Sequence, residues 1–374
     1  MGVVGAGQLA RMMGVEAHDV GVELTVLATS AQDSAVETAD HVVLGNADDE
    51  AALWQLSRVT DVVTFDHELV DLELLEALAA RGAVFRPSPA ALRFSVDKSV
   101  QRSEFSAAGF PLPRHFILRS DDDLVGLEVW IRDLATAPVL KAARGGYDGR
   151  GVLFPSSKPE ALTLAREMLK SGHVVVEERV TLLSEVAQVV VRSIDGDVLT
   201  YPLVTTVQSD AMCVEVDFPA DVDEPLRSRA RELGTALAHH VGLVGVMAVE
   251  YFVTPDALLI NELALRPHNS GHWTIEGATT SQFANHLLAV SGQGLGPADA
   301  TCTAAVMVNV VGAATPGSLE DARHVEGVHV HDYGKVWRSG RKLGHVTAVG
   351  DDPDALHVRA WNSARAYGTT TQEA

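Results

Sequence analysis

A glycine-rich segment that begins with a lysine is the first candidate for chemistry in this sequence. KAARGGYDGRG, residues 141–151, contains four glycines and three cationic side chains. Glycine permits positive φ and brings no side chain, so this backbone can turn tightly and approach an anion closely. The chain has a formal net charge of −21 and few lysines, so an anionic ligand requires a local cationic pocket. Lys141 therefore indicates phosphate binding, with a solvated hairpin loop as the alternative.

Two glutamates farther along the chain form a candidate metal site. Glu250 ends GVMAVE and Glu262 lies in LLINELA. Both segments are predicted strands joined by a turn at Pro255-Asp256, which makes the two carboxylates neighbours across a hairpin. With the Asn261 amide they form an oxygen set typical of Mg²⁺, or of Mn²⁺ in its place. Two ordinary acids at strand ends are the alternative.

Two other segments concentrate hydrogen-bond donors and positive charge. LRPHNSGHW, residues 265–273, packs five such side chains into a predicted loop: Arg266, His268, Asn269, Ser270 and His272. This loop follows the candidate carboxylates directly, so we predict that it lines the same site. YGKVWRSGRKLGH, residues 333–345, carries the densest basic cluster, Lys335, Arg338, Arg341 and Lys342. On an acidic chain that cluster is a candidate phosphate pocket, with a solvated hairpin as the alternative.

Composition limits the classes of protein to which these residues can belong. A chain of 374 residues exceeds one ordinary core, so we expect two or three domains. We expect no membrane span and no signal peptide. The negative charge disfavours nucleic acid as a partner. Two cysteines about 90 residues apart suggest neither a disulfide framework nor a metal site, which predicts a reducing cytoplasm.

Residues 1–92 are typical of a Rossmann-like α/β domain. MGVVGAGQLARMM is a strand of about three residues, a glycine turn and a helix that starts near Gln8. Further strands alternate with helices, which indicates a parallel sheet: 23–29, 41–45 and 61–66. An NAD site requires an acid at the end of the second strand, but that strand ends VLATS. We therefore expect the glycine turn to hold another small phosphate or to be structural.

The remaining chain alternates strands and helices without an internal repeat. A turn at RPSPAAL, residues 86–92, predicts a boundary. The candidate loop lies in a strand–loop–strand at 137–154, and a strand at 173–180 ends in acids. Residues 184–204 predict a hairpin that turns at Asp195-Gly196. Helices are predicted at 97–109, 159–172, 224–242 and 277–292. Short β segments from about residue 300 predict a small β-rich module.

In this order, KAARGGYDGRG, GVMAVEYFVT, NELALRPHNSGHWT, TSQF and GRKLGH resemble one family closely. The chain is identified as a member of the 5-(carboxyamino)imidazole ribonucleotide synthases, ATP-grasp enzymes of bacterial purine biosynthesis. The similarity runs from GAGQLARMM to about residue 350. The resemblance implies an ADP-forming ligase that carboxylates aminoimidazole ribonucleotide with ATP and bicarbonate, through carboxyphosphate. It also implies Mg²⁺ and a homodimer.

The same resemblance implies an α/β and α+β multidomain fold. A Rossmann-like pre-ATP-grasp domain would occupy residues 1–92. An ATP-grasp domain would follow at 93–292, with a mobile lid at about 138–205. A small β-rich domain would occupy residues 293–374.

For ATP, the resemblance implies that Lys141 holds phosphates, that the glycine loop closes over them and that Glu185 binds the ribose. Adenine would lie near Glu177–Val180. The implied nucleotide set is Lys141, Gly146, Tyr147, Asp148, Gly149, Arg150, Gly151, Glu177, Glu178, Arg179, Val180, Glu185, Gln208, Asn261 and Glu262. Glu250 and Glu262 would hold the metal.

For the ribonucleotide, the implied set is Gln8, Glu68, Tyr147, Asp148, Arg150, Arg266, His268, Asn269, Ser270, Lys335, Arg341 and Lys342. Within it, the last three residues would clamp the phosphate. Asp148 or His268 is the expected proton acceptor, because a base must lie within hydrogen-bond reach of the amine. Arg266 and Lys335 complete the expected catalytic set.

The sequence departs from the family at one framing position and at one expected nucleotide contact, and it leaves alternatives open. Leu265 stands where many members have proline. Phe94 stands where an arginine often contacts ATP, and Arg93 is one residue away. The formate-using glycinamide ribonucleotide transformylase is the nearest alternative, although GGYDGRG and HNSGHWT disfavour it. An NAD-dependent reductase lacks its ribose acid. A non-catalytic nucleotide-binding regulator would be expected to lack a metal carboxylate or the loop lysine.

Overall fold

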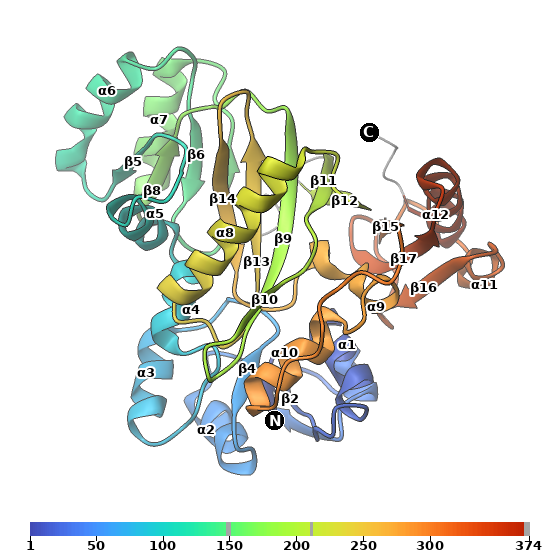
Figure 1. Cartoon of the computed structure of the whole chain (residues 1–374). Coiled ribbons are helices and arrows are strands. Elements are labelled where there is room, and N and C mark those ends of the chain that lie inside the picture. The colour runs from blue at the N-terminus through green and yellow to red at the C-terminus, as the bar shows by residue number, and fades with distance from the viewer. Residues whose placement is uncertain (147–150, 210–211, 370–374) are drawn as a thin grey trace.

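The computed structural model describes residues 1–146, 151–209 and 212–369, and three β-sheets organise them. The first strands of the largest sheet lie at the centre, with a small four-stranded sheet on one side, the amino-terminal unit below and the carboxy-terminal elements on the other side (Figure 1). No helix among these residues is long and apolar enough to cross a bilayer.

The amino-terminal sheet is parallel, with strand order β3-β2-β1-β4, as the alternating pattern predicts. Its strands are β1 (Gly2–Val4), β2 (Thr25–Ala28), β3 (His41–Leu44) and β4 (Val63–Phe65). The helices of this unit are α1 (Gln8–Ala17), η1 (Ser34–Glu37), α2 (Glu50–Val59) and α3 (Leu72–Ala80). The first helix therefore begins at Gln8, directly after the glycine turn, as expected.

A second, antiparallel sheet has the strand order β5-β8-β6-β7. Its strands are β5 (His115–Leu118), β6 (Val139–Ala142), β7 (Val152–Leu153) and β8 (Val174–Glu177). With η2 (Asp121–Asp123), α6 (Leu124–Arg132) and α7 (Lys158–Leu169), this sheet encloses a core of its own. Two helices connect it to the amino-terminal unit, α4 (Pro89–Val96) and α5 (Lys98–Ala107).

The largest sheet has nine strands, in the order β14-β13-β9-β11-β12-β15-β17-β16 with β10 paired to β9. Its first part comprises β9 (Ser184–Arg192), β10 (Val198–Thr200), β11 (Val204–Ser209), β12 (Met212–Phe218), β13 (Gly245–Val253) and β14 (Leu258–Ala264). The helical elements here are α8 (Glu224–His240), η3 (Asn269–Gly271), α9 (Thr274–Gly277) and α10 (Gln282–Ser291). The hairpin at Asp195-Gly196 is confirmed by the antiparallel pairing of β9 with β10.

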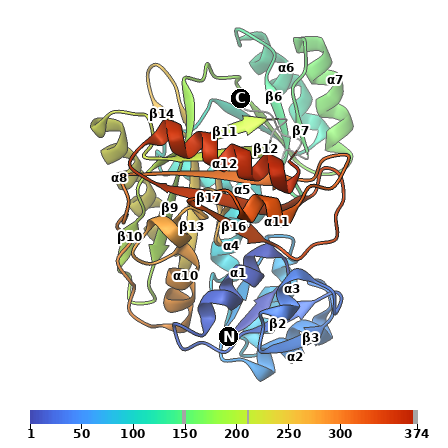
Figure 2. The same ribbon diagram turned by 90° about the vertical axis from the view of Figure 1, so that its right-hand side faces the viewer.

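The carboxy-terminal strands continue the large sheet, because β15 pairs with β12. They are β15 (Ala304–Val311), β16 (Val328–Asp332) and β17 (Lys342–Gly350), with α11 (Leu319–Arg323) and α12 (Pro353–Tyr367) packed on them (Figure 2). The sequence reading missed α12. Its amino end is nevertheless well specified, since Asp352 caps it and a proline occupies the first turn.

The region expected to be the lid, about residues 138–205, is divided between two sheets. Strands β6, β7 and β8 lie in the small antiparallel sheet, whereas β9, β10 and the start of β11 lie in the large one. The segment RPSPAAL also differs from its prediction as a turn, because Ser88 caps α4 at Pro89. The nucleotide-site candidates therefore lie where these two sheets meet.

Candidate active site

The two candidate metal carboxylates face each other across a β-hairpin. Glu250 on β13 pairs directly with Glu262 on β14, as the sequence predicts. Glu185 on β9 pairs with Phe252, two residues beyond Glu250 on β13. Because alternate residues of a strand point to one side, Glu185 shares the face of the carboxylate pair. One face of the large sheet thus presents three acids.

The charges on this acidic face are only partly balanced. Lys98 donates a hydrogen bond to Glu262, and although burial opposes ionisation, that ammonium helps to lower the pKa of Glu262. Burial and, after it, the neighbouring carboxylates of Glu262 and Glu185 together raise the pKa of Glu250 to about 7. The ammonium groups of Lys98 and Lys141 offset this rise only in part, and a divalent cation would supply the remaining counter-charge. The donor set fits Mg²⁺, which takes one or two protein carboxylates with phosphate oxygens and waters.

Lys141 on β6 lies beside this face, at the junction of the two sheets. Its Nζ is 2.7 Å from Glu177 Oε2 and donates to Asn261 Oδ1 at 3.0 Å. Arg102 Nε donates to the other oxygen of Glu177 at 2.6 Å. Burial alone would raise the pKa of Glu177, but the two cations lower it to about 2. The Glu177 side chain is therefore an ionised part of the protein framework, pairing with both cations.

Three of the other nucleotide candidates follow the end of β8, and the fourth lies on β11 of the large sheet. Glu178 donates its backbone N–H to Arg114, and its carboxylate lies 3.7 Å from the Arg114 guanidinium. Arg179 lies over the Phe154 ring, 5.7 Å from its centroid. Val180 follows in the connection to β9. Gln208 stands two residues after Thr206, which pairs with Glu185.

The glycine loop is described at both of its ends. Gly145 and Gly151 have φ values of +75° and +78°, a conformation that favours glycine. The Gly151 carbonyl accepts from Ala142 N–H at 2.8 Å, which brings the loop back to β6. Gly146 lies in the described part of the loop. Tyr147, Asp148, Gly149 and Arg150 lie outside the described residues.

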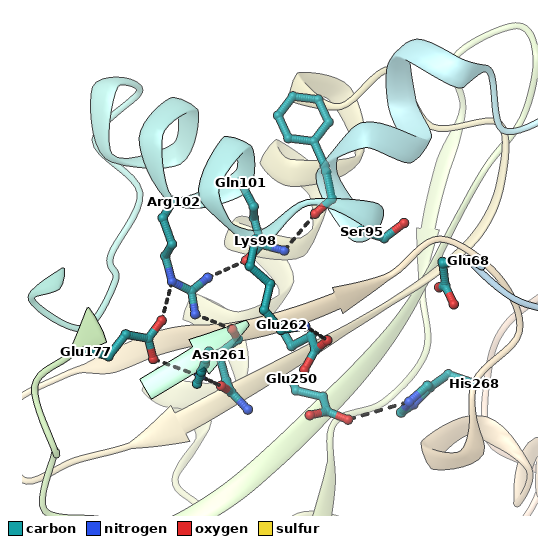
Figure 3. A network of polar contacts seen from close by, with 12 residues as sticks. Glu68, Ser95, Lys98, Gln101, Arg102, Glu177, Glu250, Asn261, Glu262 and His268 are labelled. Atoms are coloured by element: carbon teal, nitrogen blue, oxygen red, sulfur yellow. Dashed lines mark hydrogen bonds and ion pairs between the residues drawn. The ribbon is translucent and has the colours of Figure 1, made fainter. Parts of the chain in front are cut away.

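The loop after β14 places His268 beside the acidic face. His268 Nε2 is 3.5 Å from Glu250 Oε1 (Figure 3), and Nδ1 lies 3.0 Å from Ser270 Oγ. Gln282, fully buried on α10, accepts from the His268 N–H at 2.9 Å and donates to its carbonyl at 2.7 Å. Sequence reasoning gave Gln282 no role, although the TSQF motif contains it. This clamp fixes the histidine backbone.

Two residues of the predicted ribonucleotide site form an ion pair between domains. Arg266 Nε donates to Glu68 Oε2 at 2.6 Å. The other Glu68 oxygen is buried and has no hydrogen-bond partner among the described residues, and the same holds for the Asn269 amide nitrogen. A ligand with hydroxyl and acceptor groups would satisfy both atoms.

The basic carboxy-terminal segment meets the start of α1. Lys335 Nζ donates to Gln8 Oε1 at 2.6 Å and to the Lys342 carbonyl at 3.4 Å. Arg341 Nη1 donates to the Val336 carbonyl at 3.2 Å. Residues more than 300 positions apart are thereby brought together, as the predicted ribonucleotide set requires.

The glycine turn before α1 is filled by a side chain of the protein. Asp66 accepts from the backbone N–H of Gly7 at 2.5 Å and of Ala10 at 3.1 Å. A Cβ atom at Gly7 would lie 2.5 Å from the Asp66 carboxylate, which explains the glycine. Because a carboxylate already occupies this helix terminus, the turn is structural and the NAD alternative loses its phosphate site.

The position at which family members often carry an ATP-contacting arginine belongs to the hydrophobic core in this chain. Phe94 is buried and stacks on Phe105, with ring centroids 5.4 Å apart. Arg93 pairs with Glu104 at 2.7 Å. Two cations on α5 contact residues of the candidate site instead, Lys98 through Glu262 and Arg102 through Glu177, and sequence reasoning singled out neither. Leu265 is fully buried in the main core, so its substitution for proline is a packing feature.

Comparisons with known proteins identify three parts of the chain. The ATP-grasp domain model matches residues 103–283, and the ribonucleotide synthetase preATP-grasp model matches residues 1–95. The phosphoribosylaminoimidazole carboxylase C-terminal domain model matches residues 305–359. The N5-carboxyaminoimidazole ribonucleotide synthase of Mycobacterium tuberculosis is 46% identical over 368 residues, covering 96% of this chain and 85% of the relative.

The chain belongs to the N5-carboxyaminoimidazole ribonucleotide synthase family. The Thermus thermophilus synthetase structure has a TM-score of 0.89 and 32% identity, covering 100% of this chain and 99% of that one. The Aspergillus clavatus synthase, solved with ADP and 5-aminoimidazole ribonucleotide, has a TM-score of 0.88 and 30% identity. That match covers 98% of this chain and 97% of the Aspergillus chain. The resemblance inferred from the motifs, with its multidomain ATP-grasp fold, is confirmed.

Proposed function

We propose that this chain carboxylates 5-aminoimidazole ribonucleotide to N5-carboxyaminoimidazole ribonucleotide, using ATP and bicarbonate, in purine biosynthesis. The activity is that of an ADP-forming carboxylate–amine ligase. The observation that carries the proposal is a continuous row of polar groups from the candidate nucleotide site to the candidate ribonucleotide site. Lys141 contacts Asn261, the carboxylate pair adjoins it, and His268 lies 3.5 Å from Glu250.

In the first step, a bicarbonate oxygen attacks the γ-phosphorus, the bond to the β-phosphate oxygen breaks, and ADP leaves. Catalysis of this transfer depends on positioning and charge neutralisation. Lys141 and Lys98 are placed to neutralise phosphate oxygens. Glu250 and Glu262, with Asn261 beside them, would hold Mg²⁺, which supplies charge stabilisation on the phosphates when bound.

In the second step, the exocyclic amine attacks the carbonyl carbon of carboxyphosphate. The carbon–oxygen bond to phosphate breaks, phosphate leaves, and the amine nitrogen loses a proton. Among the residues that the structure describes, His268 is the candidate for accepting that proton, because Ser270 contacts its ring and Gln282 fixes its backbone. Asp148 remains the second candidate from the sequence.

The ribonucleotide would lie between the amino-terminal and carboxy-terminal units. Lys335 and Lys342, with Arg341 in the same segment, suit its phosphate, and Gln8 and Glu68 suit its sugar. The unpartnered oxygen of Glu68 and the Asn269 amide support a polar ligand here. A closing lid would protect carboxyphosphate from water. We propose the small sheet with its own core as that lid.

We also propose a homodimer in a reducing cytoplasm. Family resemblance supports the dimer, and both cysteines are free thiols, which suits a reducing compartment. Sedimentation of the purified chain tests the oligomeric state directly.

The decisive test is phosphate release from Mg·ATP with bicarbonate, in the presence and absence of 5-aminoimidazole ribonucleotide. We expect strong stimulation by the ribonucleotide, matched by incorporation of labelled bicarbonate into product. If glycinamide ribonucleotide with formate stimulated phosphate release instead, the activity would be that of the nearest alternative, the formate-using glycinamide ribonucleotide transformylase. Nucleotide binding without hydrolysis under either condition would indicate a regulator.

A further inference from the structure

Arg102 is a buried arginine that the proposed chemistry leaves without a role. It lies on α5 and is 1% exposed, so all of its hydrogen-bonding groups require partners inside the protein. Nε donates to Glu177 and Nη2 donates to the Asn261 carbonyl, each at 2.6 Å. Nη1 donates to the Gln101 side chain. A planar guanidinium presents such a fork of donors in fixed directions, whereas a lysine ammonium does not.

The two residues that Arg102 holds across the junction are also the two that hold Lys141. Glu177 offers one oxygen to each cation, and Asn261 offers its carbonyl to Arg102 and its side-chain oxygen to Lys141. Four residues therefore form a closed ring. The ring joins α5 and the small sheet to β14 of the large sheet, and Figure 3 shows Arg102 reaching both Glu177 and Asn261.

The charges of the ring explain why a second cation is needed. A lysine paired alone with a buried glutamate would form a neutral pair, which attracts an anion weakly. Arg102 adds a second positive charge to Glu177, so the ring of two cations and one carboxylate keeps a formal charge of +1. That surplus is available to a phosphate on the Lys141 side of the ring, because the Lys141 side chain is 10% exposed and that of Arg102 only 1%.

We propose that Arg102 is a positioning residue that acts through Lys141. It fixes the Lys141 ammonium at the junction of the two sheets and keeps its charge available for nucleotide phosphates, without contacting the nucleotide itself. This inference rests on the proposed nucleotide site. Other contacts support it, since the start of α5 is already attached to the small sheet: Lys98 N–H donates to the Ala143 carbonyl at 2.8 Å, and Arg144 donates to Asp97 at 2.7 Å.

The first test compares Arg102→Lys and Arg102→Gln with the wild type. We expect the Kd for Mg·ADP and the KM for ATP to rise about tenfold in both variants, because neither can form the three-way fork. The KM for the ribonucleotide should change less than about twofold. Arg192→Lys is the matched control, since Arg192 donates to the Leu243 carbonyl at 2.7 Å away from the site. It should lower the unfolding temperature and leave nucleotide affinity unchanged.

The second test combines Arg102→Gln with Lys141→Met and measures Mg·ADP affinity by calorimetry. If Arg102 acts through Lys141, adding Arg102→Gln to Lys141→Met changes the Kd less than about twofold. Additive losses would overturn the proposal, as would an Arg102→Lys variant that is less stable yet binds normally. The readout needs only nucleotide. An inactive wild type with normal Mg·ADP binding would therefore refute the proposed reaction and still test Arg102.

Discussion

Two acidic regions of this protein lie close together and have opposite electrostatic states. Where β8 ends, Glu177 is 3% exposed and is paired with two cations, so its pKa falls to about 2. On the neighbouring β13–β14 hairpin, the Glu250 side chain is 26% exposed and has other carboxylates beside it, so its pKa rises to about 7. Burial disfavours the charge of both groups. In the first region, side chains of the protein balance the carboxylate charge, and we call this region completed by the protein. In the second region, bound ligands must supply the balancing charge, and we call it completed by ligands.

The largest expected effect is on stability, in the region that the protein completes. Glu177→Gln leaves Arg102 and Lys141 without their shared carboxylate and should lower the free energy of unfolding by about 3–5 kcal/mol. Denaturant unfolding of the ligand-free protein checks this. Glu167→Gln is the control, because its ion pair with Lys170 is 70% exposed on both sides and should contribute about 0–1 kcal/mol. Equal effects of the two changes would show that the pairing of Glu177 contributes no more than a surface ion pair, contrary to this prediction.

The next largest effect should fall on catalysis, in the region completed by ligands. Glu262→Gln removes one of the two carboxylates proposed for Mg²⁺ and should lower kcat about 100- to 1,000-fold, since metal stabilisation of phosphate charge is worth several kcal/mol. Phosphate release in the presence of all three substrates measures it. Activity within about tenfold of the wild type at saturating Mg²⁺ would contradict the metal assignment.

A smaller effect should separate the ribonucleotide region from the nucleotide region. Lys335→Met removes a charged donor beside Gln8 and should raise the KM for the ribonucleotide about 10- to 100-fold, as expected for a hydrogen bond to a charged group. The KM for ATP should stay within about twofold. Initial rates with each substrate varied in turn provide both values. Arg359→Met, on α12, is the surface control and should change neither KM.

The motifs predicted the chemistry of the site better than its internal support. The register of Glu250 with Glu262 was predictable because two strands and a turn are readable locally. The roles of Lys98, Arg102 and Gln282 were not, since each depends on a contact with an element far along the chain. Arg102, for example, reaches Asn261 across 159 positions. No local pattern encodes such a partner.

The fold shows the same division between local and long-range information. The parallel amino-terminal sheet follows from its alternating elements, and the Asp195-Gly196 hairpin from its turn residues. The pairing of β12 with β15 joins the carboxy-terminal strands to the large sheet, and a strand pattern alone cannot specify that neighbour. The helix α12 was missed although its cap at Asp352 was readable.

The most gradual expected effect is the pH dependence of stability without metal. The folded-state pKa of Glu250 lies above its ordinary value of 4.5, so its contribution to stability is present below pH 4.5 and lost as pH rises through about 7. Relative to Glu250→Gln, the wild type should therefore lose stability over this range, by at most about 1.4 kcal/mol per pH unit. Glu177 has the opposite sign, with stability lost as pH falls from 4.5 toward 2. Unfolding curves of the wild type and Glu250→Gln from about pH 4 to 8, and of the wild type and Glu177→Gln from about pH 5 down to 2, compare the two slopes.

The most direct test of the contrast is the number of protons released when pre-formed Mg·ADP binds. Calorimetry in buffers of different ionisation enthalpy gives this number. With a pKa of about 7 for Glu250, binding should release about 0.9 proton at pH 6 and about 0.1 at pH 8. Glu250→Gln should abolish this pH dependence, and the control Glu167→Gln should retain it. Equal proton release at the two pH values would show that Glu250 is already ionised, contradicting the claim that ligands complete this region.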